Sequence, residues 1–177
     1  MRSREEVIKN YIKPNIQILD VGSTGQTKEY SLWNFFKSQG VRVIGIDTVP
    51  SEDPDIVMGD MESHDFGKQF DLIIAGDVLE HVKNQGMFLE NIHKHLKDGG
   101  KFVMTTPNAK WLTVFFRPNP THTLWHDKYT LRYILKLAGF DVEFFSYYFG
   151  NKKHYNFFLR PLVWRQGMIV VCKKHYG

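Results

Sequence analysis

Four aspartates each follow a short apolar run in the first part of the chain. Asp20, Asp47, Asp60 and Asp77 lie at or just after the ends of runs that are typical of buried strands. In an open sheet of parallel strands, ligands bind beyond the carboxyl ends, so these carboxylates are expected at one edge. Carboxylates accept hydrogen bonds from amines and hydroxyls. The four strand ends therefore predict a site for a ligand that carries such groups.

A glycine turn follows the first of these aspartates, in the sequence Asp20-Val-Gly22-Ser-Thr-Gly25. By itself a Gly-x-x-Gly turn is weak evidence, because most such turns only let the chain reverse its direction. A nicotinamide-dinucleotide site needs Gly-x-Gly-x-x-Gly, which brings the backbone close to a pyrophosphate. Three glycines are not present at that spacing, so the turn argues against a nicotinamide cofactor.

Two histidines are placed where a general base could act. His81 closely follows the fourth apolar run, and His126 lies just ahead of a helix predicted to begin near Thr130. Histidine can take a proton near neutral pH, as an acceptor hydroxyl requires during group transfer. The structural alternatives are that His81 packs at a helix start and that His126 occupies a surface loop.

No metal site is expected from the histidine spacing. His93 and His95 are two helix positions apart, so they point to different faces, and both are expected on the surface. His122 and His126 have i,i+4 spacing, but prolines precede them and the sequence offers no obvious third ligand.

The composition of the 177 residues narrows the class of protein. The single cysteine, Cys172, excludes internal disulfides and four-cysteine zinc sites, and its place within a predicted strand argues against a cysteine nucleophile. No apolar run approaches the roughly 20 residues of a membrane-spanning helix, and the N-terminal residues are charged. We therefore expect a soluble, cytoplasmic protein without a targeting segment.

The charge is distributed unevenly along the chain. The formal net charge is +4, with −5 on residues 1–100 and +9 on residues 101–177. One interpretation is that the two parts neutralise each other in the folded domain. The other is an acidic cofactor-binding part and a basic acceptor-binding part.

The hydrophobic pattern predicts an α/β domain covering residues 1–177. Alternating strands and helices with apolar strands indicate an open, mostly parallel seven-stranded Rossmann-like sheet with helices on both faces. The last two strands are not joined by a long helix, so the last strand is expected to be antiparallel. The predicted strands are 16–21, 41–46, 56–58, 70–75, 101–105, 140–148 and 167–172, and the predicted helices are 4–13, 30–40, 87–96 and 130–137.

Several of these segments together resemble the class I S-adenosylmethionine-dependent methyltransferases, in the branch of small-molecule and ubiquinone-biosynthesis enzymes. The segments are Ile18–Gly22, Val43–Asp47, Phe70–His81 and Leu96–Asn108, of which Val-Leu-Glu-His and Thr-Pro-Asn are the most specific pieces. The sequence departs from the family where the usual acid-x-Gly-x-Gly-x-Gly lacks one glycine.

The resemblance implies S-adenosyl-L-methionine as the cofactor and assigns its contacts. Asp20 and the Gly22-Ser23-Thr-Gly25 turn would hold the methionine part, with Gly76 and Asp77 beside its amino group. Asp47, followed by Thr48, would take the ribose hydroxyls, and Asp60 with Met61 would read the adenine. His126 and His81 remain the expected catalytic histidines.

The methyl acceptor is expected to bind through residues 107–127 and 150–165. Oxygen is the favoured acceptor atom, because the fourth strand lacks the Asn/Asp-Pro-Pro-aromatic signature of amino-directed base methyltransferases. Interleaved basic and aromatic residues in the C-terminal part suit nucleic-acid stacking, a lipid interface or an aromatic pocket, or else are ordinary core with a solvated rim. The basic charge favours an anionic, lipid-linked or sugar-linked small molecule, or a membrane surface. A nucleic-acid methyltransferase and a non-catalytic binding module that retains the fold are the alternatives, and the oligomeric state is left open.

Overall fold

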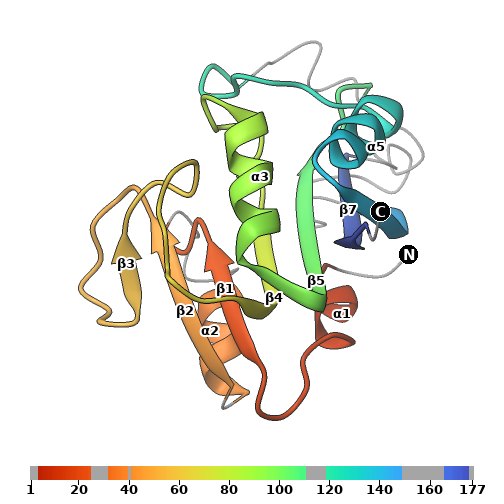
Figure 1. The fold of residues 1–177 in the computed structure, drawn as a ribbon. Helices are drawn as coiled ribbons and strands as arrows, with labels where there is room; N and C mark the ends of the chain where they lie inside the picture. Colours follow the sequence, from red (N-terminus) through yellow and green to blue (C-terminus); the bar gives the residue numbers. More distant parts are fainter. Residues whose placement is uncertain (1–3, 25–31, 40, 111–118, 149–165, 176–177) are drawn as a thin grey trace, which may run out of the picture.

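The computed structural model describes residues 4–24, 32–39, 41–110, 119–148 and 166–175 (Figure 1). Its centre is a seven-stranded sheet with the order β3-β2-β1-β4-β5-β7-β6. The strands are β1 (Gln17–Val21), β2 (Arg42–Asp47), β3 (Ile56–Met58), β4 (Phe70–Gly76), β5 (Leu96–Pro107), β6 (Phe140–Tyr148) and β7 (Gly167–Lys174).

The directions of the strands confirm the predicted fold class. The pairs formed by β1 to β5 are all parallel, whereas β7 lies antiparallel to both β5 and β6. Because these strands are parallel, the carboxyl ends of β1, β2, β3 and β4 lie at the same edge of the sheet. The four aspartates noted above lie at or directly after these strand ends.

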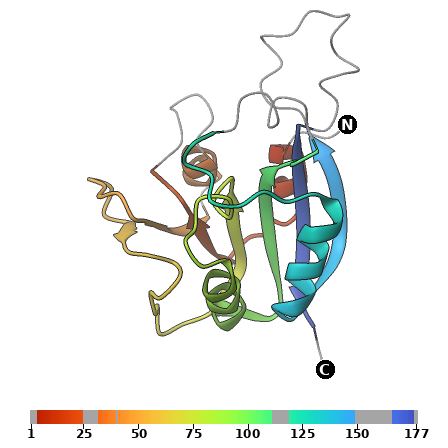
Figure 2. The ribbon, with the colours of Figure 1, turned by 90° about the horizontal axis from the view of Figure 1, so that it is seen from above.

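Helices cover both faces of the sheet, as Figure 2 shows. The short helices α1 (Arg4–Lys9) and α2 (Leu32–Ser38) lie on one face, and α3 (Gln85–His95) and α5 (Lys128–Leu137) lie on the other. Two buried clusters result, one on each face. The first includes Ile8, Ile18, Phe36, Leu72 and Val171, and the second includes Leu19, Ile73, Leu89, Phe102 and Leu135.

Several elements differ in length from the sequence prediction, most clearly the first helix and the fifth strand. The first helix ends at Lys9, and Asn10, Tyr11 and Ile12 instead donate to carbonyls three residues back, in a tighter turn before Pro14. Strand β5 begins at Leu96, five residues earlier than expected, because Leu96 already pairs with Phe70. A shift of register then accommodates the Gly-Gly turn.

The expectation that His95 lies on the surface is wrong. Its side chain is buried on the inner face of α3, where it continues the apolar positions Phe88 and Ile92. The ring is fully used, since Nδ1 lies 2.9 Å from the Asn91 carbonyl and Nε2 accepts the Phe66 N–H at 3.1 Å. His95 is therefore a satisfied core residue.

His93 is also less exposed than expected. It is half-buried, and its ring packs edge-on against Phe140 at 5.2 Å between centroids. The two histidines do point in different directions, as the helix period predicts.

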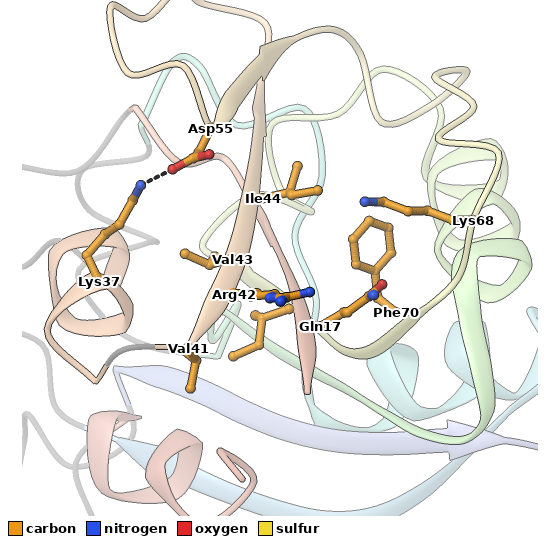
Figure 3. A pocket seen from close by; sticks show the side chains of 10 residues that line it. Gln17, Lys37, Val41, Arg42, Val43, Ile44, Asp55, Lys68 and Phe70 are labelled. Atoms are coloured by element: carbon orange, nitrogen blue, oxygen red, sulfur yellow. Dashed lines mark hydrogen bonds and ion pairs between the residues drawn. The ribbon is translucent and has the colours of Figure 1, made fainter. Parts of the chain in front are cut away.

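A pocket of about 520 Å³ opens at the amino end of the sheet, opposite the aspartates (Figure 3). Gln17, Arg42 and Phe70, at the starts of β1, β2 and β4, contribute to its lining. Lys37 and Asp55 form an ion pair at its side. Because ligands of open α/β sheets bind at the carboxyl ends of the strands, this pocket is not the cofactor site.

Candidate active site

Asp20, in β1, is the most unusual group at the carboxyl edge. Its side chain is fully buried, and neither carboxylate oxygen has a hydrogen-bond partner among the described residues. Burial raises the pKa of Asp20 to about 8, with a smaller raising effect from Asp47 and an opposing effect from Arg4. A carboxyl group kept in this state is suited to a ligand that brings a positive charge, because that charge would stabilise its ionised form.

The turn after β1 is tightly constrained. Gly22 has φ +79°, and a Cβ built there would lie 2.6 Å from Val78 Cγ2. Only glycine fits both the left-handed conformation and this close approach. The Ser23 hydroxyl donates to the Asp20 carbonyl at 2.7 Å, which fixes the start of the loop. Gly25 lies outside the described residues.

Asp47, at the end of β2, ties two loops together. One carboxylate oxygen accepts the Thr24 N–H at 2.8 Å, and the other accepts the Val49 N–H at 3.0 Å. The carboxylate is only partly buried, and Thr48 beside it is exposed. Since each carboxylate oxygen has two lone pairs, the group can accept hydroxyl donors in addition.

Asp60 and Met61 follow β3 but differ in their environments. Asp60 is exposed, and its side chain accepts the Glu62 N–H at 2.9 Å, in the manner of a turn cap. Met61 is buried in the core beneath α3, and its carbonyl accepts from the Asn91 side chain. The Met61 side chain therefore packs the core, and only its main chain can face a ligand at this strand end.

Asp77 is the hub of a network that sequence reasoning missed. It has φ +55°, and its Oδ1 accepts from the Thr105 hydroxyl at 3.1 Å and from Tyr148 at 2.9 Å. Its Oδ2 lies 3.4 Å from an Arg4 nitrogen. The segment that begins at Gly76 is thus held by α1, β5 and β6. No local pattern signals the contributions of Arg4 and Tyr148, because both come from distant parts of the chain.

His126 is buried, contrary to the surface-loop alternative. Its Nε2 lies 2.8 Å from Gln85 Oε1 at the start of α3, and its carbonyl accepts the Ala109 N–H. Its Nδ1 is buried without a hydrogen-bond partner in the described part of the chain. Burial lowers the pKa of His126. A neutral ring therefore joins the segment before α5 to α3.

A second group of side chains gathers around His81. The ligating atoms of Glu80, His81 and His122 all lie within 4.8 Å of one another, and the two imidazole rings meet edge-on at 4.6 Å. The sequence spacing did not reveal this group, because His122 approaches from a segment some 40 residues away in the chain. The Val-Leu-Glu-His piece was the one local signal.

The segments that were expected to bind the methyl acceptor are only partly described. Residues 111–118 and 150–165 lie outside the described residues. The part that is described approaches the segment after β4, since the Thr123 N–H donates to the Glu80 carbonyl at 2.7 Å and the Thr121 carbonyl lies 3.2 Å from His81 Nδ1.

Comparison with known proteins decides the family. A family model described as a methyltransferase domain matches residues 3–144. The chain belongs to this methyltransferase family. A ubiquinone biosynthesis O-methyltransferase of Rickettsia conorii is 29% identical over 106 residues, which cover 52% of this chain and 35% of that protein. The matched stretches span between 20% and 35% of the lengths of the curated relatives.

Solved structures show the same fold. A methyltransferase from Archaeoglobus fulgidus superimposes with a TM-score of 0.71 at 20% identity and covers 97% of this chain and 91% of its own. A glycopeptide N-methyltransferase complexed with S-adenosyl-L-methionine gives 0.68 at 13% identity, with 96% and 92% covered.

The methyltransferase domain therefore makes up most of the chain, and one neighbour with the same fold is a structure complexed with S-adenosyl-L-methionine. The carboxyl edge fits this cofactor, because the buried Asp20 carboxyl group has no hydrogen-bond partner among the described residues and because Gly22 lets the backbone turn where a Cβ would meet Val78. Among the described residues, none of the helices has the length and apolar character required to span a bilayer.

Proposed function

We propose that this methyltransferase transfers the methyl group to an oxygen atom of a small-molecule acceptor by in-line displacement. The observation that supports this most directly is the arrangement of segment 76–81, which runs from the cofactor turn to the histidine cluster. Val78 packs against Gly22, and Glu80 and His81 follow within three residues. A methyl donor at Gly22 and an acceptor at His81 would thus be adjacent.

The cofactor contacts in this proposal follow the strand ends. Asp20, Gly22, Ser23 and Gly25 hold the methionine part, and Gly76 and Asp77 border its amino group. The ribose and adenine contacts come from the next two strand ends, at Asp47, Thr48, Asp60 and Met61. The ammonium and sulfonium charges of the cofactor would stabilise the ionised form of Asp20.

Methyl transfer breaks the bond between carbon and sulfur and forms the bond between carbon and the acceptor oxygen. The acceptor loses its proton, and the sulfonium becomes a neutral thioether. The protein mainly contributes positioning. Of the two expected histidines, His81 is exposed at this edge, whereas His126 is buried and bonded to Gln85. We therefore place oxygen activation at the His81 end and assign His126 to positioning.

The acceptor is proposed to be anionic, because few ion pairs among the described residues join the basic C-terminal part to the acidic part. Among the ion pairs of the described residues, Lys174–Asp98 joins the two parts, whereas others such as Lys101–Glu143 stay within one part. The oxygen preference is supported by the O-methyltransferase relatives, whose names concern ubiquinone biosynthesis.

The proposal is tested by incubating the protein with S-adenosylmethionine and a library of hydroxyl, amine and nucleic-acid acceptors at low and high salt. Mass spectrometry should detect methylated hydroxyl compounds, with anionic ones favoured at low salt. His81→Ala should reduce turnover by about 10²–10⁴-fold. Methylation of amines or nucleic acid alone would contradict the oxygen assignment, and cofactor binding without any product would favour the non-catalytic alternative.

A further inference from the structure

We infer that Glu80, His81 and His122 form a binding site for a divalent transition-metal ion of the Zn²⁺ type. The three side chains come from two segments, one following β4 and the other preceding α5. Their ligating atoms lie within 4.8 Å of one another in the described structure. One carboxylate and two imidazoles are a donor set that binds Zn²⁺ and related ions.

The first observation is the state of the Glu80 carboxylate. Its residue is 2% exposed, and Oε2 accepts the Thr106 hydroxyl at 3.0 Å. Oε1 is buried and has no hydrogen-bond partner among the described residues. A buried carboxylate oxygen is costly unless a partner satisfies it, and a cation is the partner that suits a charged group best.

The second observation is the orientation of the two imidazoles. His81 Nδ1 lies 3.2 Å from the Thr121 carbonyl, so an Nδ1–H donor leaves the Nε2 lone pair free for a metal. A backbone carbonyl that orients the other ring nitrogen is the usual second-sphere partner of a ligating histidine. His122 Nδ1 is buried and has no partner among the described residues.

The separations are compatible with a metal after small side-chain movements. Bonds of about 2.0–2.1 Å in a tetrahedral site place ligand atoms about 3.3 Å apart. The observed limit of 4.8 Å is larger, but His81 is exposed and His122 is half-buried, so both rings can rotate inward. Glu80 is the fixed member, because Thr106 and the core hold it.

Three protein ligands leave a fourth position open, which is typical of a catalytic rather than a structural site. The inference here rests on the proposed function: an acceptor hydroxyl would occupy that position. Bound to the metal, it would release its proton to water at lower pH than in solution. Its oxygen would then attack the methyl carbon as the carbon–sulfur bond breaks. The metal would thus replace a protein base, which agrees with the buried state of His126.

Metal binding can be tested without any acceptor. The metal-free protein is titrated with Co²⁺ alone, followed by visible absorption, and with Zn²⁺ alone, followed by calorimetry. We expect one equivalent to bind. Glu80→Gln keeps the size of the side chain. Glu80→Gln and His122→Ala should each weaken metal binding at least 100-fold. Thr106→Val, which removes only the hydroxyl that orients Glu80, should weaken binding by about 10–100-fold.

The matched control is His175→Ala, which removes an exposed histidine paired with Asp141 far from the cluster. It should bind the metal like the wild type. Equal binding by the wild type and both ligand variants, or no binding by the wild type, would overturn the inference. Displacement of Co²⁺ by moderate Mg²⁺ would overturn the assignment to nitrogen-binding metals.

S-adenosylhomocysteine titration of the same variants separates this inference from the proposed function. Unchanged cofactor affinity in Glu80→Gln together with lost Co²⁺ binding supports a distinct metal site. Methyl transfer to hydroxyls by a chain that binds no metal would leave the proposed function intact and remove the metal site. Metal binding without methylation of any hydroxyl would support the metal site and contradict the proposed function.

Discussion

The buried carboxyl of Asp20 makes a specific prediction about stability and pH. Its pKa is 3.8 in an unfolded chain and about 8 in the folded protein. The unfolded state therefore ionises first as the pH rises, while the native state keeps its proton. Stability attributable to this group falls between these two pH values, by about 1.4 kcal/mol per pH unit. Asp20→Asn removes the titration and keeps the shape of the protonated acid.

The magnitude is best measured as a difference, because the amide has its own cost of burial. From pH 5 to pH 8, the free energy of unfolding of the variant should rise by about 3–4 kcal/mol relative to the wild type. Urea denaturation at several pH values measures this gap. Asp60→Asn is the matched control, since Asp60 is an exposed aspartate at another strand end of the same edge. Between pH 5 and pH 8, the free energy of unfolding of Asp60→Asn should stay within about 0.5 kcal/mol of the wild-type value.

Cofactor binding provides an independent measure of the protonation state of Asp20. If the cofactor cation ionises Asp20, binding at pH 7 should release up to about one proton. Calorimetry in buffers of different ionisation enthalpy measures that release, and Asp20→Asn should abolish it. The reasoning would be refuted if the difference in free energy of unfolding between Asp20→Asn and the wild type did not change with pH and no proton were released on binding. Asp20 would then already be ionised in the folded protein.

Three further measurements follow from the same edge of the sheet. Asp47→Ala should weaken S-adenosylhomocysteine binding by about 10–100-fold in calorimetry, because a charged acceptor worth about 1.5–3 kcal/mol is lost; unchanged affinity would exclude Asp47 from the ribose site. His126→Gln, which can still donate to Gln85, should lose less stability than the wild type as the pH falls below 6.5, since burial lowers the pKa of His126 and its protonation opposes folding; parallel pH profiles would contradict this. Tyr148→Phe should lower the free energy of unfolding by about 1.5–3 kcal/mol, because the Asp77 carboxylate loses a donor; an unchanged denaturation midpoint would argue against that hydrogen bond.

Local patterns were enough to predict the strands and the acidic strand ends. A strand that is buried on both faces is a continuous apolar run, and the polar residue that ends it is visible at once, as with Asp20 and Asp47. The glycine turn is equally local. The antiparallel direction of the last strand was also predictable, because the final pair of strands lacks a crossover helix. The order of the strands in the sheet was not predicted.

The parts that were missed depend on residues far apart in the chain. His95 was expected on the surface because its spacing from His93 was read without knowing how wide the buried face of α3 is. Only the folded topology brings Glu80 close to His122 and brings Arg4 and Tyr148 to Asp77. Spacing rules find ligands on one helix or loop, whereas these groups are assembled from separate segments.

The position of β7 between β5 and β6 has a consequence for biosynthesis. β6 precedes β7 in the chain, yet it pairs only with β7 among the described strands, and β7 in turn completes β5. As the polypeptide leaves the ribosome, β6 has no edge to join until residues 167–174 have emerged. The unpaired edge of β5, with buried residues such as Val103, is exposed for that interval. A nascent chain stalled before residue 167 should therefore be captured by chaperones more readily than one in which an added C-terminal linker carries residue 174 out of the ribosome.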